Sequence, residues 1–306
     1  EAYMRTMSET YLGQTLKDVR HKIIISTKHG VSAPGEMDQK TLIRRVEGSL
    51  KRLQTDTIDI ALIHQVSDPA ILTNNEILAA YDRLKKEGKV RFTGFSTHVA
   101  ETLFPPLLET ASYDVVLFVY NHLEGPPLDS LIDKVRAKGI GMIAMKALAG
   151  NKQGSLKSLV NEQTKYSQAA LGWVLANPSI DCCLITMNTF SHVEEYVAAS
   201  GKPLDGSSLK ALSKYRNEAG ALYCRVSCRE CLKSCPEGVA INDVLRYSMY
   251  FEDYRLERNA IELYGGLAQG RKPINCGACL APCTGACPFG IPIRDQLLHA
   301  HRLLLV

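Results

Sequence analysis

The sequence predicts an α/β protein whose larger part is a barrel of parallel strands and whose smaller, C-terminal part is helical. Over roughly the first two hundred residues, short runs rich in β-branched and aromatic residues alternate with longer amphipathic segments. This is the pattern of βα units around a parallel sheet. From about Ser207 the alternation stops, and eight of the ten cysteines lie beyond that point. We therefore predict two domains, residues 1–206 and residues 207–306.

Six strands are expected in the first domain, each a short and mostly apolar run. In chain order they are Lys22–Lys28, Ile58–His64, Val90–Ser96, Val115–Tyr120, Gly141–Lys146 and Cys182–Met187. No Gly-rich phosphate-binding fingerprint follows the first of them, which disfavours a doubly wound sheet. The expected fold is therefore a (β/α)8 TIM barrel. Because a barrel cannot close with six of its eight strands, we expect its first two strands to precede Glu1.

Helical patterns occupy the intervals between the strands, and several end at a glycine or at an Asn-Pro pair, both of which stop helices. They cover Asp38–Leu53, Asn74–Glu87, Pro127–Ala137 and Tyr166–Ala176. In the second domain, helical segments are expected at Ser207–Ala219, Asn242–Tyr264 and Ile293–Leu305.

Composition excludes several classes of protein. A chain of 306 residues with 45% hydrophobic content can bury one large core and carry a second small domain. The net charge is only +4 and no basic stripe is interleaved with aromatic residues, so nucleic acid is not an expected partner. The apolar runs are far shorter than the roughly 18 to 20 residues that span a bilayer. No secretory signal is visible, and we expect a cytoplasmic protein, although an export signal upstream of Glu1 stays compatible with the sequence.

Eight cysteines form two quartets, each closed by a proline. The spacings are C-x3-C-x2-C-x3-C-P and C-x2-C-x3-C-x3-C-P. Thiolates two or three residues apart with this ending are typical of the ferredoxin run, from which each quartet departs by one residue. We therefore predict a helical, ferredoxin-like domain with two [4Fe-4S] clusters. The ligands are Cys224, Cys228, Cys231 and Cys235 in the first quartet and Cys276, Cys279, Cys283 and Cys287 in the second.

In the ferredoxin run the fourth cysteine binds the other cluster. With that pairing, Cys287 completes the cluster of the first quartet and Cys235 that of the second. Two zinc sites would use the same eight thiolates, but zinc does not call for a cysteine followed by proline. Disulfides suit small secreted folds without a large core. Cys182 and Cys183 are expected to be core residues of a buried strand.

Polar residues at the carboxyl ends of barrel strands are the default catalytic positions. The sequence places ten residues at or just after those ends. They are Lys28, His64, Ser96, Thr97, His98, Asn121, Lys146, Met187, Asn188 and, further on, His192.

The segment AYMRTMSETYLG, residues 2–13, resembles the stretch of aldo-keto reductases in which a catalytic tyrosine precedes Ser-Glu and Leu-Gly. Tyr3 matches that tyrosine, Lys28 in Ser-Thr-Lys matches the catalytic lysine, and His64 in DIALIH matches the active-site histidine. The resemblance covers roughly residues 1–200 and includes GKVRFTGFS, Tyr-Asn and ALGWVL further along. With the cysteine-rich C-terminus, the chain resembles the iron–sulfur branch of that superfamily.

The resemblance implies an acid–base mechanism. A tyrosine phenol has a pKa of about 10, and a nearby lysine ammonium favours the phenolate. Tyr3 would then protonate a carbonyl oxygen as a hydride arrives, Lys28 would tune Tyr3, and His64 would orient and polarise the carbonyl. The aspartate that pairs with the lysine in the family precedes the tyrosine by five residues, which places it before Glu1.

The resemblance also implies cofactor positions. The residues expected to bind a nicotinamide cofactor are Ser96, Thr97, Asn121, Lys146, Met187, Asn188, His192 and Glu195. Where the family commonly clamps the 2′-phosphate of NADPH, this chain has Thr186, Met187 and His192, without an arginine. An arginine–phosphate contact is bidentate and charge-assisted, and neutral side chains do not replace it. We therefore expect poor binding of NADPH, and either NADH or no nicotinamide in its place.

The leading hypothesis is an oxidoreductase that interconverts a small-molecule carbonyl and an alcohol and exchanges electrons with a redox partner protein through its clusters. The alternative is an electron-transfer or assembly subunit whose barrel is a catalytically eroded scaffold. A third hypothesis is an NADH-dependent carbonyl reductase whose clusters are structural.

Overall fold

The computed structural model describes residues 6–30, 38–110, 112–124, 128–150 and 166–305. The chain divides into two compact units, which we take in their described parts. The first, called the sheet unit, comprises Glu1–Val119, Pro126–Met145 and Asn177–Leu184. The second, called the helical unit, comprises Tyr120–Gly125, Lys146–Ala176 and Ile185–Val306.

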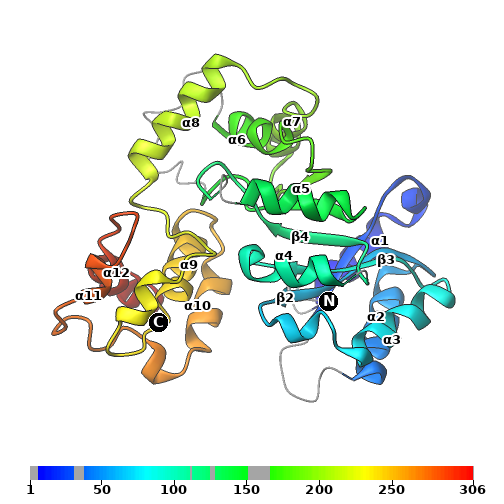
Figure 1. Cartoon of the computed structure of the whole chain (residues 1–306), viewed down its shortest axis with the longest axis horizontal. Coiled ribbons are helices and arrows are strands. Elements are labelled where there is room, and N and C mark those ends of the chain that lie inside the picture. Colours follow the sequence, from blue (N-terminus) through cyan, green and yellow to red (C-terminus); the bar gives the residue numbers. More distant parts are fainter. Residues whose placement is uncertain (1–5, 31–37, 111, 125–127, 151–165, 306) are drawn as a thin grey trace. The chain divides into compact units, whose positions relative to one another are not determined.

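All six predicted strands are present in the sheet unit, and they are parallel and follow one another across the sheet in chain order (Figure 1). They are β1 (Ser26–Gly30), β2 (Ile58–Val66), β3 (Val90–Thr97), β4 (Val115–Val119), β5 (Gly141–Met145) and β6 (Cys182–Leu184). This order is that of a barrel wall rather than of a doubly wound sheet, whose order reverses at a switch point.

Two strand ends differ from the prediction. The expected first strand begins at Lys22, but Lys17–Lys22 is a 3-10 helix, η2, and β1 starts at Ser26. The expected last strand runs to Met187, but β6 ends at Leu184. Cys182 is exposed and Cys183 half-buried, so the expectation that both are buried core residues is wrong. Among the described strands β6 has a neighbour on one side only, which explains the exposure.

The helices of the sheet unit follow the predicted pattern. They are α1 (Met7–Thr15), α2 (Gln39–Leu53), α3 (Asn75–Lys86), α4 (Ala100–Glu109) and α5 (Asp129–Ala137), with a short 3-10 turn, η3, at Pro69–Ile71. The side chains of Asp38 and Asn74 accept backbone hydrogen bonds at the starts of α2 and α3, as N-caps do. Gly88 and Gly139 follow α3 and α5 with φ of 69° and 82°, a conformation that glycine adopts without strain.

The sheet is buried between side chains of its own unit. Every residue of β4 is buried, and Phe118 packs edge-on against Phe104 of α4 with ring centroids 5.1 Å apart. Gly94 of β3 lies so close to β4 that an added Cβ would stand 1.8 Å from the carbonyl oxygen of Val115. The strand spacing at this point therefore requires glycine.

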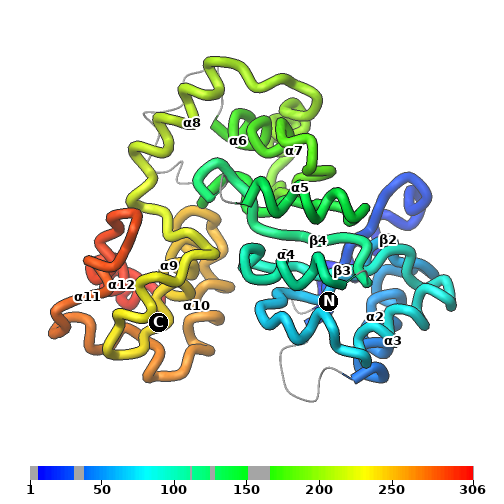
Figure 2. The backbone as a smooth tube through the Cα atoms, in the orientation of Figure 1, coloured from blue at the N-terminus to red at the C-terminus, as the bar shows by residue number. Residues whose placement is uncertain are grey.

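The described part of the helical unit contains helices and loops. Its helices are α6 (Tyr166–Leu175), α7 (Phe190–Val197), α8 (Gly206–Ala219), α9 (Ile241–Glu252), α10 (Glu257–Gly265), α11 (Pro282–Gly285) and α12 (Ile293–Leu304), with 3-10 turns η7 (Glu230–Ser234) and η8 (Gln269–Arg271). Figure 2 shows the chain from α9 to α12 folded back on itself. The expected helix Asn242–Tyr264 is broken between α9 and α10, where Arg255 has a φ of 55°.

A core of apolar side chains holds α9, α10 and α12 together, with Ile241, Val244 and Leu297 fully buried in it. The division of the chain at residue 206 stays a prediction. No described helix is both long and apolar enough to span a membrane.

Candidate active site

Lys28 and His64 lie on neighbouring parallel strands at their carboxyl ends. In the register between β1 and β2, Lys28 pairs with Leu62, two residues before His64. Paired residues of parallel strands share a face, and every second residue returns to that face. The side chains of Lys28 and His64 therefore project from the same face of the sheet.

Burial sets the protonation of both groups. Lys28 is only 8% exposed, and this burial lowers the pKa of its ammonium to about 8. Burial, and next the positive charge of Lys28, lower the pKa of His64 to about 4. At neutral pH the imidazole is therefore uncharged, with one N–H that can donate a hydrogen bond. The structure brings these two predicted residues together electrostatically as well as by register.

Tyr3, the third predicted catalytic residue, lies outside the described residues. Helix α1 begins at Met7, four residues further along the chain.

Ser96 and Thr97 end β3, next to the strand that carries His64. The Ser96 hydroxyl accepts a hydrogen bond from the backbone N–H of Gln65 at 2.9 Å. The Thr97 hydroxyl, fully buried, accepts one from the N–H of Val99 at 3.0 Å. Both side chains are thus held at the strand end by backbone donors, which gives this edge of the sheet a defined shape.

Asn121 and Lys146, from the helical unit, are joined by a hydrogen bond. Asn121 is fully buried, its Nδ2 donates to the carbonyl oxygen of Lys146 at 3.2 Å, and its Oδ1 accepts from the N–H of Leu123 at 2.9 Å. The backbone of Lys146 is in the left-handed region, with φ of 59°, a conformation that costs a non-glycine residue energy and recurs at functional sites.

Tyr250 of α9 is a neighbour of Lys146 that the sequence analysis missed. The Lys146 Nζ donates to the Tyr250 hydroxyl at 3.3 Å and lies 5.5 Å from the centre of its ring. Tyr250 in turn stacks on Tyr254, with ring centroids 5.7 Å apart. The only sequence signal was the tyrosine-rich composition of this segment, which does not say which tyrosine meets a lysine 104 residues away.

The remaining predicted cofactor residues separate into two groups around α7. The N–H of Asn188 donates to Nδ1 of His192 at 3.3 Å, and Met187 is 41% exposed. The backbone oxygen of Glu195 instead accepts from Gln168 of α6 at 2.9 Å, and its carboxylate accepts from the Ser167 hydroxyl. Glu195 therefore faces α6, whereas Asn188 and His192 form the start of α7.

The relatives of this chain decide its family. Residues 1–162 match the sequence profile of the Aldo/keto reductase family. L-galactose dehydrogenase of Arabidopsis thaliana is 30% identical over 226 residues, which are 64% of this chain and 70% of that protein. The chain belongs to the aldo/keto reductase family. Methylglyoxal reductase YeaE of Escherichia coli is 25% identical over 228 residues, 70% of this chain and 77% of that protein.

Solved structures of aldo-keto reductases share the fold. An enzyme from Klebsiella pneumoniae in complex with NADPH matches with a TM-score of 0.59 at 24% identity, over 70% of this chain and 77% of the other. The holo form of AKR11C1 from Bacillus halodurans matches with a TM-score of 0.58 at 21% identity, over 70% and 79%. The six-stranded parallel sheet thus corresponds to a TIM-barrel-like aldo-keto reductase fold, and the predicted oxidoreductase of this type is confirmed.

The predicted cofactors need correction. We expected NADPH to bind less well than NADH, yet two aldo-keto reductase structures from Klebsiella pneumoniae with this fold hold NADPH and NADP. The expectation relied on the lack of an arginine near His192, and a single missing contact does not decide between two cofactors that share all their other groups.

The two predicted [4Fe-4S] clusters are also corrected. Within the part of the chain that the structure describes, no group of three or more His, Cys, Asp or Glu side chains is placed to hold a metal ion. The eight cysteines expected as ligands are all free thiols: Cys224, Cys228, Cys231, Cys235, Cys276, Cys279, Cys283 and Cys287.

The physical reason lies in the surroundings of these thiols. Cys231, Cys276 and Cys283 are buried members of the apolar core of the helical unit. Burial is the first cause that raises the pKa of Cys231 and Cys276 to about 11, so both stay neutral thiols and pack as small apolar side chains. A metal ligand is a thiolate. The ferredoxin-like character predicted for this part of the chain goes with the clusters.

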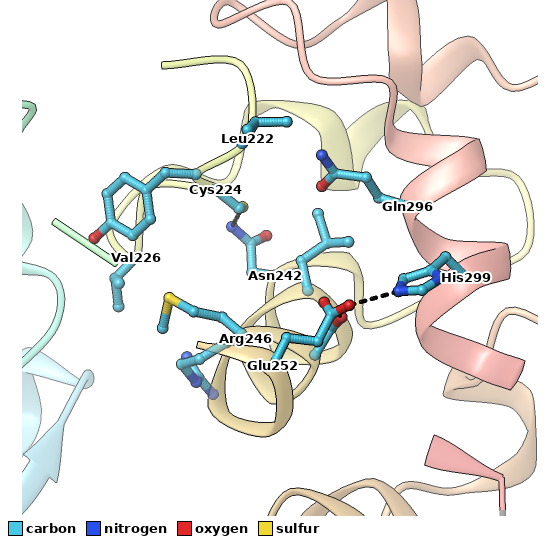
Figure 3. A pocket seen from close by; sticks show the side chains of 12 residues that line it. Leu222, Cys224, Val226, Asn242, Arg246, Glu252, Gln296 and His299 are labelled. Atoms are coloured by element: carbon cyan, nitrogen blue, oxygen red, sulfur yellow. Dashed lines mark hydrogen bonds and ion pairs between the residues drawn. The ribbon is translucent and has the colours of Figure 1, made fainter. Parts of the chain in front are cut away.

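A cavity of about 220 Å³ lies in the helical unit, between α9, α12 and residues 222–226 (Figure 3). Its polar lining residues pair with one another. His299 Nε2 lies 2.8 Å from Glu252 Oε1, and Asn242 Nδ2 donates to the sulfur of Cys224 at 3.4 Å. None of the predicted catalytic or cofactor-binding residues lines it, so it is separate from the reductase site.

Proposed function

We propose that this aldo-keto reductase transfers a hydride between NADPH and a small carbonyl compound, and in reverse between an alcohol and NADP. The observation that carries the proposal is the pair formed by Lys28 and His64, which project from one face at the carboxyl ends of β1 and β2. Two relatives support the substrate class, since one is named a dehydrogenase of L-galactose and the other a reductase of methylglyoxal.

In the proposed reaction each residue handles a proton or a hydrogen bond. Tyr3 gives its phenolic proton to the carbonyl oxygen as the hydride reaches the carbonyl carbon. Lys28, half-way to losing its own proton at pH 8, favours the resulting phenolate. His64 donates a hydrogen bond to the carbonyl oxygen from its neutral imidazole, so that it polarises the substrate without protonating it.

The chain has groups that fit a dinucleotide. Lys146 and Tyr250 offer an ammonium and a hydroxyl 3.3 Å apart, both donors for phosphate oxygens. We propose that they hold the pyrophosphate, with Asn121 fixing the Lys146 backbone. Ser96 and Thr97 are proposed for the nicotinamide, and Met187, Asn188, His192 and Glu195 for the adenosine end. When bound, the nicotinamide supplies or accepts the hydride.

Electron exchange through clusters is not part of the proposal. The expected redox partner protein depended on those clusters and goes with them. The alternative of an electron-transfer or assembly subunit with an eroded barrel has no observation in its favour, because Lys28 and His64 keep a shared face and shifted pKa values.

Replacement of Lys28 tests the proposal. NADPH oxidation is followed with methylglyoxal, and NADP reduction with L-galactose. Lys28→Met should lower kcat by about 10²-fold to 10⁴-fold, because the phenolate loses its neighbouring cation. Lys86→Met, an exposed lysine of α3, is the matched control and should leave kcat unchanged. Wild-type protein without turnover of either substrate, or a Lys28→Met variant as active as Lys86→Met, would show the proposal to be wrong.

A further inference from the structure

Helix α1 is attached to the sheet unit by a charge and a glycine rather than by an apolar face. Glu9 and Gly13 are its buried residues, and Glu9 is only 4% exposed. Its large apolar side chains, Met7, Tyr11 and Leu12, are between 38% and 50% exposed. A buried carboxylate is expensive unless it is paired and hydrogen-bonded, so its partners determine how α1 is held.

Both oxygens of Glu9 have a partner, on two different elements. Oε1 accepts from the hydroxyl of Thr27 on β1 at 2.5 Å, and Oε2 accepts from Nε of Arg52 at the end of α2 at 2.8 Å. The glycine of α1 explains how the helix comes this close, because a Cβ at Gly13 would stand 2.3 Å from the carbonyl oxygen of Arg52. One carboxylate therefore joins α1, β1 and α2.

The network continues beneath the strand. Arg52 Nη2 donates to the hydroxyl of Ser49 at 3.2 Å, and that hydroxyl lies 3.1 Å from Nε2 of His29. Ser49 and His29 are fully buried, as this network requires. Thr27 and His29 flank Lys28 on β1, so the two neighbours of Lys28 belong to one buried network that Glu9 anchors.

The faces of the strand give this network a role. Alternate residues of a strand point to opposite sides, so Thr27 and His29 are held on the side opposite to Lys28. Helix α1 follows directly on the segment that carries Tyr3. We propose that Glu9 is a positioning residue, which ties the helix that follows Tyr3 to the strand that carries Lys28 and so sets the geometry of that pair. The inference rests on the proposed reductase function.

An apolar contact would also attach a helix, but it tolerates sliding because it has no direction. Two hydrogen bonds from a single carboxylate fix both the distance and the orientation of α1 relative to β1. A displacement of about 1 Å between reacting groups can cost about 10²-fold in rate. Loss of the Thr27 contact should therefore act on kcat and leave ligand binding nearly unchanged.

A matched pair of variants at Thr27 tests the inference. Thr27→Val keeps the shape of the side chain and removes the donor to Glu9, whereas Thr27→Ser keeps the donor. With methylglyoxal and NADPH at 25 °C, Thr27→Val should lower kcat by about tenfold or more, with KM for both ligands within about twofold. Thr27→Ser should restore kcat to within about twofold of the wild type.

A merely structural role gives a different result. It would lower the melting temperature of Thr27→Val while kcat below that temperature stayed at the wild-type value, and this outcome overturns the inference. Equal losses of kcat in Thr27→Val and Thr27→Ser overturn it too. If Thr27→Val does not fold, Glu9→Gln replaces it, since glutamine keeps an acceptor for Thr27 but loses the ion pair with Arg52. A folded Glu9→Gln protein with unchanged kcat would contradict the inference.

The proposed function fails separately. Wild-type protein without NADPH-dependent turnover refutes the function before any variant is compared. Active wild-type protein with an inactive Lys28→Met variant and a fully active Thr27→Val variant refutes the positioning role alone.

Discussion

At the scale of single residues, burial rather than ion pairing sets the chemistry of the candidate site. Lys28 loses most of its contact with water, and the pKa of its ammonium falls to about 8. His64 is affected by its own burial and by the charge of Lys28, and its pKa falls to about 4. The result is a neutral hydrogen-bond donor beside a lysine whose charge is easily lost, which suits a reaction that moves a proton near neutral pH.

The shift of His64 predicts a pH dependence of stability. The folded pKa of about 4 lies below the ordinary 6.5, so between these values the unfolded chain binds more protons than the folded chain. Stability contributed by neutral His64 is therefore present above pH 6.5 and is lost as the pH falls to about 4. His64→Gln should reduce the drop in unfolding free energy over this range by about 2 kcal/mol, measured by urea denaturation. His21→Gln, at an exposed position, is the control, and an equal reduction there would contradict the assignment.

At the scale of elements, the helices of the sheet unit start and end where short-range chemistry places them. The side chain of Asn74 accepts a hydrogen bond from the N–H of Ile77 at 3.1 Å and caps α3. Asp38 does the same for α2 through the N–H of Thr41 at 2.7 Å. Helix α1 is the exception, since no side chain caps its start and a buried carboxylate holds it.

Two adjacent asparagines test the capping contribution. Asn74→Ala removes the acceptor at the start of α3 and should lower the unfolding free energy by about 1 kcal/mol. Asn75→Ala, within the first turn, should change it by less than about 0.5 kcal/mol, because alanine is the better helix former there. Thermal or urea unfolding measures both. Similar losses in the two variants would show that the cap is not the stabilising contact.

At the scale of the whole molecule, the chain is an aldo-keto reductase sheet unit together with a helical unit that has its own apolar core. The predicted cofactor residues belong to both units, since Ser96 and Thr97 lie in the first and Lys146, Asn121 and the α7 residues in the second. Cofactor binding is therefore a property to be measured on the full chain.

Cofactor binding should stabilise the full chain against heat. A ligand present at about 100 times its Kd stabilises the folded state by about 2.7 kcal/mol. We expect NADPH to raise the melting temperature more than the same concentration of NADH, measured by differential scanning fluorimetry. Lys146→Met should weaken NADPH binding by about tenfold, since it removes a cation next to the proposed pyrophosphate. Lys86→Met serves as the control, and a larger shift with NADH would contradict the cofactor assignment.

Much of the fold was accessible from local patterns. Strand runs and amphipathic helices have periods that a few residues reveal, so all six strands were expected within a few residues of their positions. The errors at Lys22 and Met187 lie at strand ends, where few contacts decide the state of a residue. The catalytic pair was also accessible, because both residues end predicted strands and match a known motif.

The cysteines show the opposite case. Their spacing along the chain says which thiols can lie near one another, but a metal site requires them to converge in space, and the folding of the segments between them decides that. The structure instead gives Cys231, Cys276 and Cys283 apolar neighbours. Tyr250 was out of reach for the same reason, since its contact with Lys146 spans 104 positions.

The amino-acid order alone establishes the family, the alternation of strands and helices, and the candidate residues, because each of these depends on neighbours along the chain or on a matched motif. Which face Lys28 and His64 share, how far burial shifts their pKa values, and that Glu9 joins α1 to β1 and α2 became known only from the folded chain. These properties depend on strand register and on exclusion of water, and both arise only when distant segments pack together.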